Sequence, residues 1–124
     1  MTTFSSWGPA DDGRIKPDIS APGCQSNDDL DVTSCSSSGD TAYAGKCGTS
    51  MACPTTVGVS ALILQDYRQQ FPGQPDFRNS TLKTILAHTA VDVFEPGPDY
   101  KSGYGSIRVE PAIQLVRAGN FLEN

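Results

Sequence analysis

A hydroxyl side chain stands at the expected start of a helix, within the run Gly-Thr-Ser-Met-Ala at residues 48–52. The residues before it are rich in Ser, Gly and Asp, and Pro54 follows at a position that a first helical turn tolerates. Residues 57–64 are apolar almost all round, which indicates a buried helix. The hydroxyl of Ser50 would then lie beside unpaired backbone N–H groups at the positive end of the helix dipole. This arrangement is typical of an activated serine nucleophile whose own backbone N–H is one oxyanion-hole donor.

The same residues also fit a purely structural role. Ser and Thr are among the commonest helix N-caps, and a Gly-Thr-Ser before an apolar helix is usually a cap. On the local physics of Ser50 alone, the cap is the more frequent outcome, and the nucleophile is the alternative.

Four stretches of the chain resemble, in the same order, motifs of the subtilisin-like serine proteases. They are residues 4–9, 13–23, 48–54 and 103–109. One departure is Cys53, which stands where that family usually has Ser or Thr. The resemblance covers nearly the whole chain and implies that Ser50 is the catalytic nucleophile, with its backbone N–H in the oxyanion hole.

The resemblance also implies a fold class, and it implies that the rest of the catalytic domain lies upstream of these residues. Residues 1–124 are expected to be the C-terminal portion of a subtilisin-like peptidase catalytic domain. The fold class is α/β: part of a three-layer fold with a parallel sheet and flanking helices, helix-rich in this portion. The family takes its catalytic Asp and His, and an Asn of the oxyanion hole, from upstream segments that nothing here resembles. We therefore expect a serine endopeptidase component that hydrolyses peptide bonds only with those segments, and an inactive isolated chain.

His88 is the only histidine and the alternative candidate for a base. The pattern over residues 80–90 predicts a helix with an inner face of Leu82, Ile85, Leu86 and Thr89. His88 tends outward on it, and the corresponding helix has no role in the family's triad. The default is therefore a partly exposed histidine near the negative end of a helix dipole. Asp18 matches a structural position of the family and not the triad acid.

Hydrophobic periodicity and turn residues outline the other elements. We expect extended stretches at 2–6 and 16–20, a loop or irregular hairpin at 24–47, helices at 50–70, 80–90 and 110–118, and a surface loop at 95–99. The net charge of -5 argues against nucleic-acid binding. No run approaches the roughly 18 apolar residues of a membrane span. With 124 residues, the chain can bury a modest core but not a large sheet covered on both sides.

Four cysteines without a Cys-x-x-Cys motif argue against zinc. An even count in a family that is mostly secreted favours two disulfides, with three connectivities open, and a secreted or periplasmic location. We expect a Cys47–Cys53 bridge across the corner that carries Ser50, with Cys24 and Cys35 both in the long loop. The alternative is that Cys47 and Cys53 are reduced packing residues.

Three acidic residues, Asp28, Asp29 and Asp31, crowd the start of the long loop. Subtilisin-like enzymes often bind calcium, but this spacing matches no defined calcium loop. A solvated acidic loop is the more frequent outcome, so no cofactor is expected here and calcium stays open for the complete protein.

A second class of function is a non-catalytic module, either a pseudoprotease or a self-associating fragment. The intact serine motif favours the enzyme, whose substrate would be a protein or peptide. The apolar helix at 57–64 lacks most of the strands that enclose it in the family. We therefore expect it to bind the remaining protease segment or a second copy of this chain.

Overall fold

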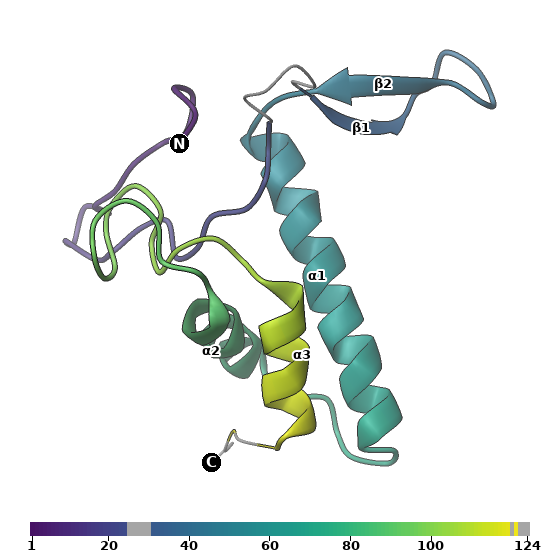
Figure 1. Cartoon of the computed structure of the whole chain (residues 1–124), viewed down its shortest axis with the longest axis vertical. Helices are drawn as coiled ribbons and strands as arrows, with labels where there is room; N and C mark the ends of the chain where they lie inside the picture. Colours follow the sequence, from purple (N-terminus) through teal and green to yellow (C-terminus); the bar gives the residue numbers. More distant parts are fainter. Residues whose placement is uncertain (25–30, 120, 122–124) are drawn as a thin grey trace.

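The computed structural model describes residues 1–24, 31–119 and 121. Its elements are, in chain order, β1 (Val32–Cys35), β2 (Tyr43–Lys46), α1 (Thr49–Gln70), α2 (Asn79–Thr89) and α3 (Val109–Arg117) (Figure 1). All three predicted helices are confirmed, each within one residue of its expected ends. The hairpin expected within residues 24–47 is also confirmed, as is the turn-rich surface loop at 95–99.

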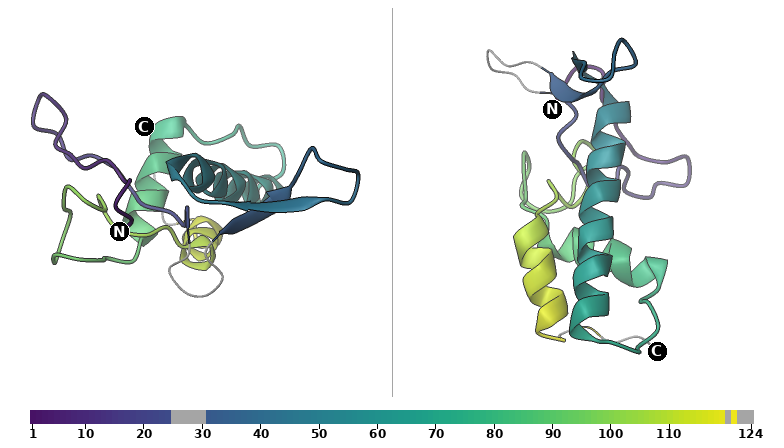
Figure 2. Two further views of the ribbon diagram at one scale, coloured as in Figure 1. Left: turned by 90° about the horizontal axis from the view of Figure 1, so that it is seen from above. Right: turned by 90° about the vertical axis from the view of Figure 1, so that its right-hand side faces the viewer.

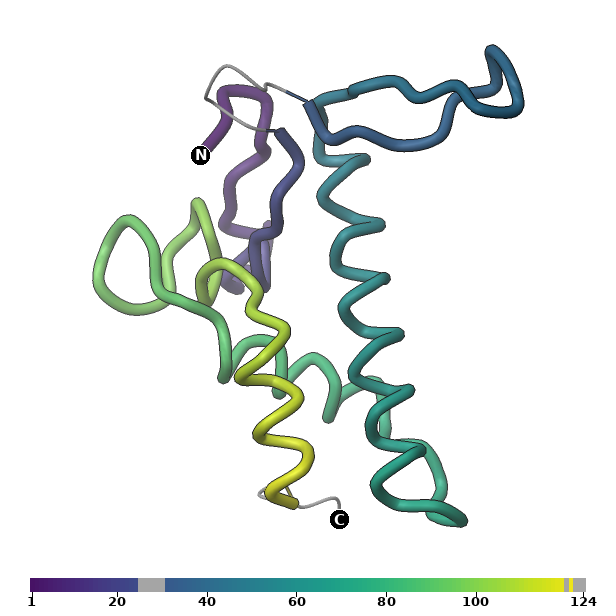
Figure 3. Tube along the Cα trace, turned by 45° about the vertical axis from the view of Figure 1, so that its right-hand side comes forward, coloured from purple at the N-terminus to yellow at the C-terminus, as the bar shows by residue number. Residues whose placement is uncertain are grey.

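The hairpin β1–β2 is antiparallel, with Val32 opposite Lys46 and Cys35 opposite Tyr43. It projects beyond the N-terminal end of α1, away from the other helices (Figures 1 and 3). Nearly all of its residues are exposed to solvent. Among the described residues, the hairpin therefore adds no buried side chain to the core.

Helix α1 begins directly after Gly48 and ends at Gln70, where Phe71-Pro72-Gly73 follows. Pro72 has no N–H to continue the helical ladder, and Gly73 adopts a φ of 84° in the turn. The position expected for Pro54 was wrong, because Pro54 lies in the second turn and not the first. Its missing N–H leaves the Ser50 carbonyl without the usual helical donor at this point.

The core forms where the three helices meet. Helix α3 runs beside α1, and α2 packs against α3 (Figures 1 and 2). The buried cluster consists of Val59, Ile63, Tyr67, Phe77, Ile85, Leu86, Ala112 and Val116. As predicted, Ile85 and Leu86 lie on the inner face of α2, and Lys83 and His88 are exposed. Helices α2 and α3 thus pack with α1 in one apolar core.

A half-buried ion pair, between exposed Arg117 and buried Asp66, adds a polar link between α1 and α3. The guanidinium of Arg117 contacts the carboxylate of Asp66 at 2.6 Å, and Asp66 is buried. Hydrogen bonding to Asp66 raises the pKa of Arg117. Because the pair is charge-assisted and uses two guanidinium nitrogens, it fixes the rotation of α3 against α1.

The N-terminal segment reaches the helical body through Ser20. Its backbone pairs in parallel with Ser106, which in turn pairs in antiparallel fashion with Val91. The extended stretch expected at 2–6 was wrong, since a turn closes there with the Ser5 N–H donating to the Thr2 carbonyl at 3.2 Å. Of the stretch at 16–20, only Ser20 forms a β-bridge in the described part of the chain. Strands need neighbours, and outside the β1–β2 hairpin the described residues form isolated β-bridges only, so the three-layer arrangement stays a prediction.

Within the described ranges, no helix combines the length and apolar character needed to cross a membrane.

The position of Ile63 predicts a large stability difference between two neighbouring residues. Ile63 is 0% exposed, whereas Leu62 is 51% exposed. Truncating Ile63→Ala leaves a cavity among three helices and should lower the free energy of unfolding by about 3 kcal/mol. Leu62→Ala is the matched control and should change it by less than about 0.5 kcal/mol. Urea unfolding followed by circular dichroism measures both, and equal effects would contradict the core described above.

Candidate active site at the start of helix α1

Ser50 is the second residue of α1 and is exposed to solvent. The backbone N–H groups of Met51 and Ala52 donate to the Gly48 carbonyl at 3.0 and 3.3 Å, which closes the first turn. No side chain caps this turn, and it contains no acidic residue. The hydroxyl of Ser50 therefore lies at the positive end of a helix dipole, in a first turn that itself carries no acidic side chain.

Gly48 gives the chain an entry into the helix that other residues rarely adopt. Its φ is 156° and its ψ is 164°, a region almost limited to glycine. The carbonyl of Gly48 can thereby accept the two bonds of the first turn while its own N–H points back to Gly23, which accepts it at 2.9 Å. The corner that carries Ser50 is thus tied directly to Gly23.

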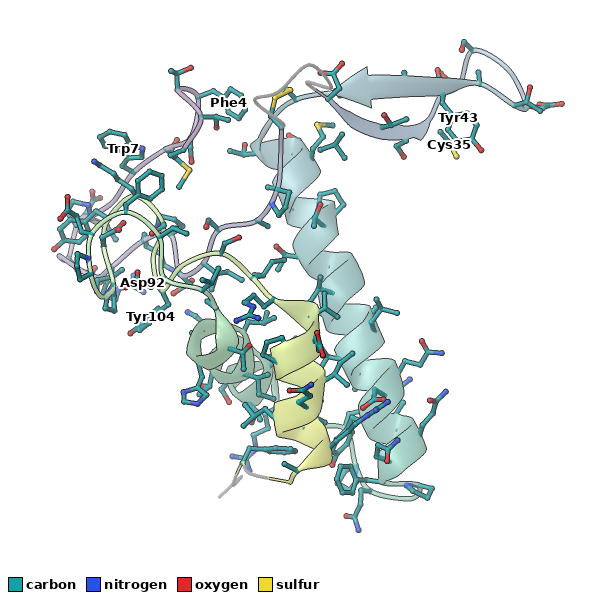
Figure 4. The ribbon with its side chains drawn as sticks, viewed as in Figure 1. Phe4, Trp7, Cys35, Tyr43, Asp92 and Tyr104 are labelled. Atoms are coloured by element: carbon teal, nitrogen blue, oxygen red, sulfur yellow. A yellow bond between two sulfur atoms is a disulfide. The ribbon has the colours of Figure 1, made fainter. Side chains whose placement is uncertain are left out.

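A disulfide joins the same two segments. Cys24 is bonded to Cys47, and their Cα atoms lie 4.7 Å apart. Figure 4 shows this bond at the N-terminal end of α1, with Cys35 toward the far end of the hairpin. The expected Cys47–Cys53 bridge was therefore wrong, and one bridge is present where two were expected: the thiols of Cys35 and Cys53 are free and exposed.

The pairing follows from the hairpin. The chain leaves at Cys24, forms β1 and β2, and returns at Cys47, so an antiparallel hairpin brings these two residues together. Cys53 lies in the second turn of α1 and is carried away along the helix. The sequence held one signal for this pairing, since each of the two cysteines adjoins a glycine, Gly23 or Gly48, at an end of the predicted hairpin.

The structure does not bring His88 to Ser50. The α2 residues Ile85 and Leu86 pack with Ile63, thirteen residues beyond Ser50 in the sequence of α1 and hence about 20 Å along its axis. Figures 1 and 2 show α2 beside the second half of α1. His88 is exposed in the last turn of α2, as expected for a histidine outside the site.

Asp18 has a structural environment. Partial burial acts to raise the pKa of its carboxyl, but hydrogen bonds from Lys16 and Lys83 outweigh burial and hold the pKa below its usual range. The Asp18 carbonyl also accepts the Tyr104 N–H at 2.9 Å. Asp18 therefore connects the N-terminal segment to α2 and to the glycine turn at 103–105, where Gly103 has a φ of 67°.

Of the acidic residues considered for calcium, Asp28 and Asp29 lie outside the described residues. Asp31 lies at the base of β1 and packs closely against Gly45 of the partner strand. In the described ranges, no three His, Cys, Asp or Glu residues are grouped to hold a metal ion. The calcium site stays an open expectation for the complete protein.

Known proteins of one family are similar to this chain. The family model described as "Subtilase family" matches residues 1–105. C5a peptidase of Streptococcus pyogenes is 38% identical over 96 residues, which are 77% of this chain and 8% of that protein. Serine protease AprX of Bacillus subtilis is 32% identical over 119 residues, 91% of this chain and 25% of AprX. Minor extracellular protease Vpr of the same organism is 34% identical, with 98% of this chain and 15% of Vpr covered.

Solved structures of proteases are also similar to this chain. The CspB protease of Clostridium perfringens matches 88% of this chain and 22% of its own, with a TM-score of 0.71 and 25% identity. A lanthipeptide protease matches 59% of this chain and 21% of its own, with a TM-score of 0.52 and 33% identity. The chain thus spans a quarter or less of each of these five proteins. Because the family model covers most of its length, this chain belongs to the subtilase family.

Proposed function

We propose that this chain supplies the nucleophile-bearing, C-terminal portion of a subtilisin-like serine endopeptidase, and that Ser50 is the nucleophile. The observation that carries the proposal is the exposed hydroxyl in the uncapped first turn of α1, in a chain of this family. The catalytic Asp and His, and the second oxyanion donor, would come from polypeptide outside these 124 residues.

The geometry of the corner fits this chemistry. A base from the missing portion would take the Ser50 proton as the oxygen attacks a peptide carbonyl. The negative oxygen that develops would accept the Ser50 N–H, one of the donors that a first helical turn leaves unpaired. The positive end of α1 would stabilise the same charge. Because Gly48 has no side chain, the substrate backbone can approach the loop before Ser50 closely.

The missing portion also has a place to bind. One face of α1, here called the outer face, is exposed from residue 53 to residue 62 and consists of Cys53, Pro54, Val57, Gly58, Ala61 and Leu62. Val57 is 62% exposed, and every member of this face is apolar or small. The opposite face of α1 is already occupied by the core. We propose that the remaining part of the protease domain covers the outer face, since this chain is a quarter or less of its relatives.

The competing function is a non-catalytic, self-associating fragment. The outer face of α1 would serve that role equally well, with a second copy as its occupant. The intact Gly-Thr-Ser-Met-Ala run favours the peptidase, because self-association has no chemical need for a hydroxyl at residue 50. A secreted location is part of the proposal and fits the Cys24–Cys47 disulfide, which persists in oxidising compartments.

Replacing Ser50 tests the assignment. In a protein that joins this chain to its Asp- and His-bearing portion, Ser50→Ala should lower kcat for peptide hydrolysis by about 10⁶, the size of the effect known for the triad serine of subtilisin. Ser60→Ala is the matched control, because that hydroxyl bonds only the Thr56 carbonyl within the same helix. It should leave kcat within a factor of about two. Hydrolysis retained by Ser50→Ala would remove Ser50 from the mechanism.

The isolated chain should react slowly with a fluorophosphonate probe. Without a base within reach, the Ser50 hydroxyl stays protonated and poorly nucleophilic. Labelling followed by mass spectrometry should give the same low rate for the wild type and for His88→Ala. Fast labelling that is lost in His88→Ala would show that His88 acts as a base, for example across a dimer.

The reactivity of the exposed Cys53 thiol can test whether the outer face of α1 is covered, with exposed Cys35 as the control. In the isolated chain, Cys53 and Cys35 should both react readily with a maleimide, because both thiols are exposed. Adding the remaining protease portion should protect Cys53 at least about tenfold and leave Cys35 on the hairpin unchanged as an internal control. Protection that grows with the concentration of this chain alone, together with a dimer in light scattering, would identify a second copy as the occupant. A compact monomer whose Cys53 stays reactive with the partner present would contradict both occupants.

A further inference from the structure

Several interactions between residues 22–24 and residues 47–55 hold the corner that carries Ser50. The Gly48 N–H donates to the Gly23 carbonyl at 2.9 Å, and the Thr55 hydroxyl reaches the Pro22 carbonyl at 3.3 Å. The Cys24–Cys47 disulfide is the one covalent link between these segments. We call this set of contacts the Ser50 clamp.

The two sides of the clamp are in direct backbone contact. A Cβ atom placed on Gly23 would lie 2.5 Å from the Gly48 carbonyl oxygen and 3.1 Å from the Cβ of Ala52. Such an atom could not fit without moving residue 48 or the first turn of α1. The position of Ser50 is therefore set by how closely residue 23 approaches residue 48.

Packing of the hairpin cannot replace the disulfide. The described residues between Cys24 and Cys47 contribute no member to the buried cluster, and both strands are largely exposed. Without the disulfide, the 22 residues between Cys24 and Cys47 would form a loop closed at its base by hydrogen bonds such as the one from the Gly48 N–H to the Gly23 carbonyl. Closing such a loop costs conformational entropy, and an exposed hydrogen bond offsets little of it.

We propose that the Cys24–Cys47 disulfide is a positioning element for Ser50, and that its reduction switches the site off reversibly. This inference rests on the proposed role of Ser50 as nucleophile. A dithiol would supply the two electrons: its thiolate attacks one sulfur, the Cys24–Cys47 bond breaks, and both cysteines leave as thiols while the reductant becomes a disulfide. Nothing at Ser50 itself changes chemically.

The expected consequence is a loss of kcat with little change in KM. Displacement of a reacting group by about 1 Å costs on the order of 10²-fold in rate. Ser50 and its N–H act on the reacting carbonyl, whereas most substrate contacts are expected from the missing portion. We therefore expect reduction to lower kcat about tenfold to a hundredfold and to leave the melting of the helical core nearly unchanged.

The first measurement needs no activity. Amide hydrogen exchange of the oxidised 124-residue chain should show protection at Gly48, whose N–H is bonded to Gly23. Reduction, or Cys24→Ser, should speed exchange at Gly48 at least about tenfold and leave Ile63 in the core of α1 unchanged. Cys35→Ser and Cys53→Ser are the matched controls, because both thiols are free. Unchanged exchange at Gly48 after reduction would overturn the inference.

The second measurement uses the complete protease at a temperature where it is fully folded. Reduction should lower kcat, reoxidation should restore it, and Cys35→Ser should behave as the wild type throughout. Gly23→Ala disturbs the clamp without touching sulfur and should lower kcat in the oxidised enzyme as well. If Cys24→Ser does not fold, graded reduction of the wild type followed by reoxidation gives the same answer.

The outcomes separate this inference from the function on which it rests. If Ser50→Ala keeps hydrolysis, the proposed nucleophile is wrong, whatever reduction does. If Ser50→Ala is inactive but full reduction leaves both kcat and Gly48 exchange unchanged, the nucleophile stands and the positioning role of the disulfide fails. A fall in core stability that accounts for all of the lost activity would also overturn the positioning role.

Discussion

The packing of α1 against α2 and α3 around Ile63 is the interaction on which the rest of the structure depends. This helix carries Ser50 in its first turn and contributes Val59, Ile63 and Tyr67 to the core farther along. Burial of Ile63, Ile85 and Val116 fixes α1 in the body of the chain, and the Asp66–Arg117 pair sets the rotation of α3 against it. Because a helix is stiff over its length, a core formed near Ile63 also orients the first turn about 20 Å away.

The other end of α1 is organised by quite different forces. No buried apolar side chain lies in the hairpin that leads into Ser50, so hydrophobic burial does not hold that corner. Backbone contact between Gly23 and Gly48, with the disulfide beside it, takes its place. The three helices are thus held by an apolar core, whereas the corner at Ser50 is held by backbone contact and a disulfide. That division makes it physically reasonable for redox conditions to affect Ser50 without unfolding the body.

The exposed outer face of α1 connects the fold to the proposed assembly. A helix that is apolar on nearly all sides is normally buried on all sides, yet here Val57 and Leu62 face solvent. The same chain spans a quarter or less of its relatives in the subtilase family. The exposed apolar face and the small share of the relatives' length both support the proposal that further polypeptide covers α1.

The sequence by itself determined the three helices, the hairpin, the family and the candidate nucleophile. These follow from local signals: periodicity in residues 50–70, turn residues, and a run of five residues around Ser50. Only the tertiary structure decided that Cys24 pairs with Cys47 and which face of α1 stays exposed. Helix periodicity depends on neighbours three or four residues apart, whereas pairing and exposure depend on distances between segments far apart in the chain. An apolar pattern on every side of a helix cannot say which side finds a partner.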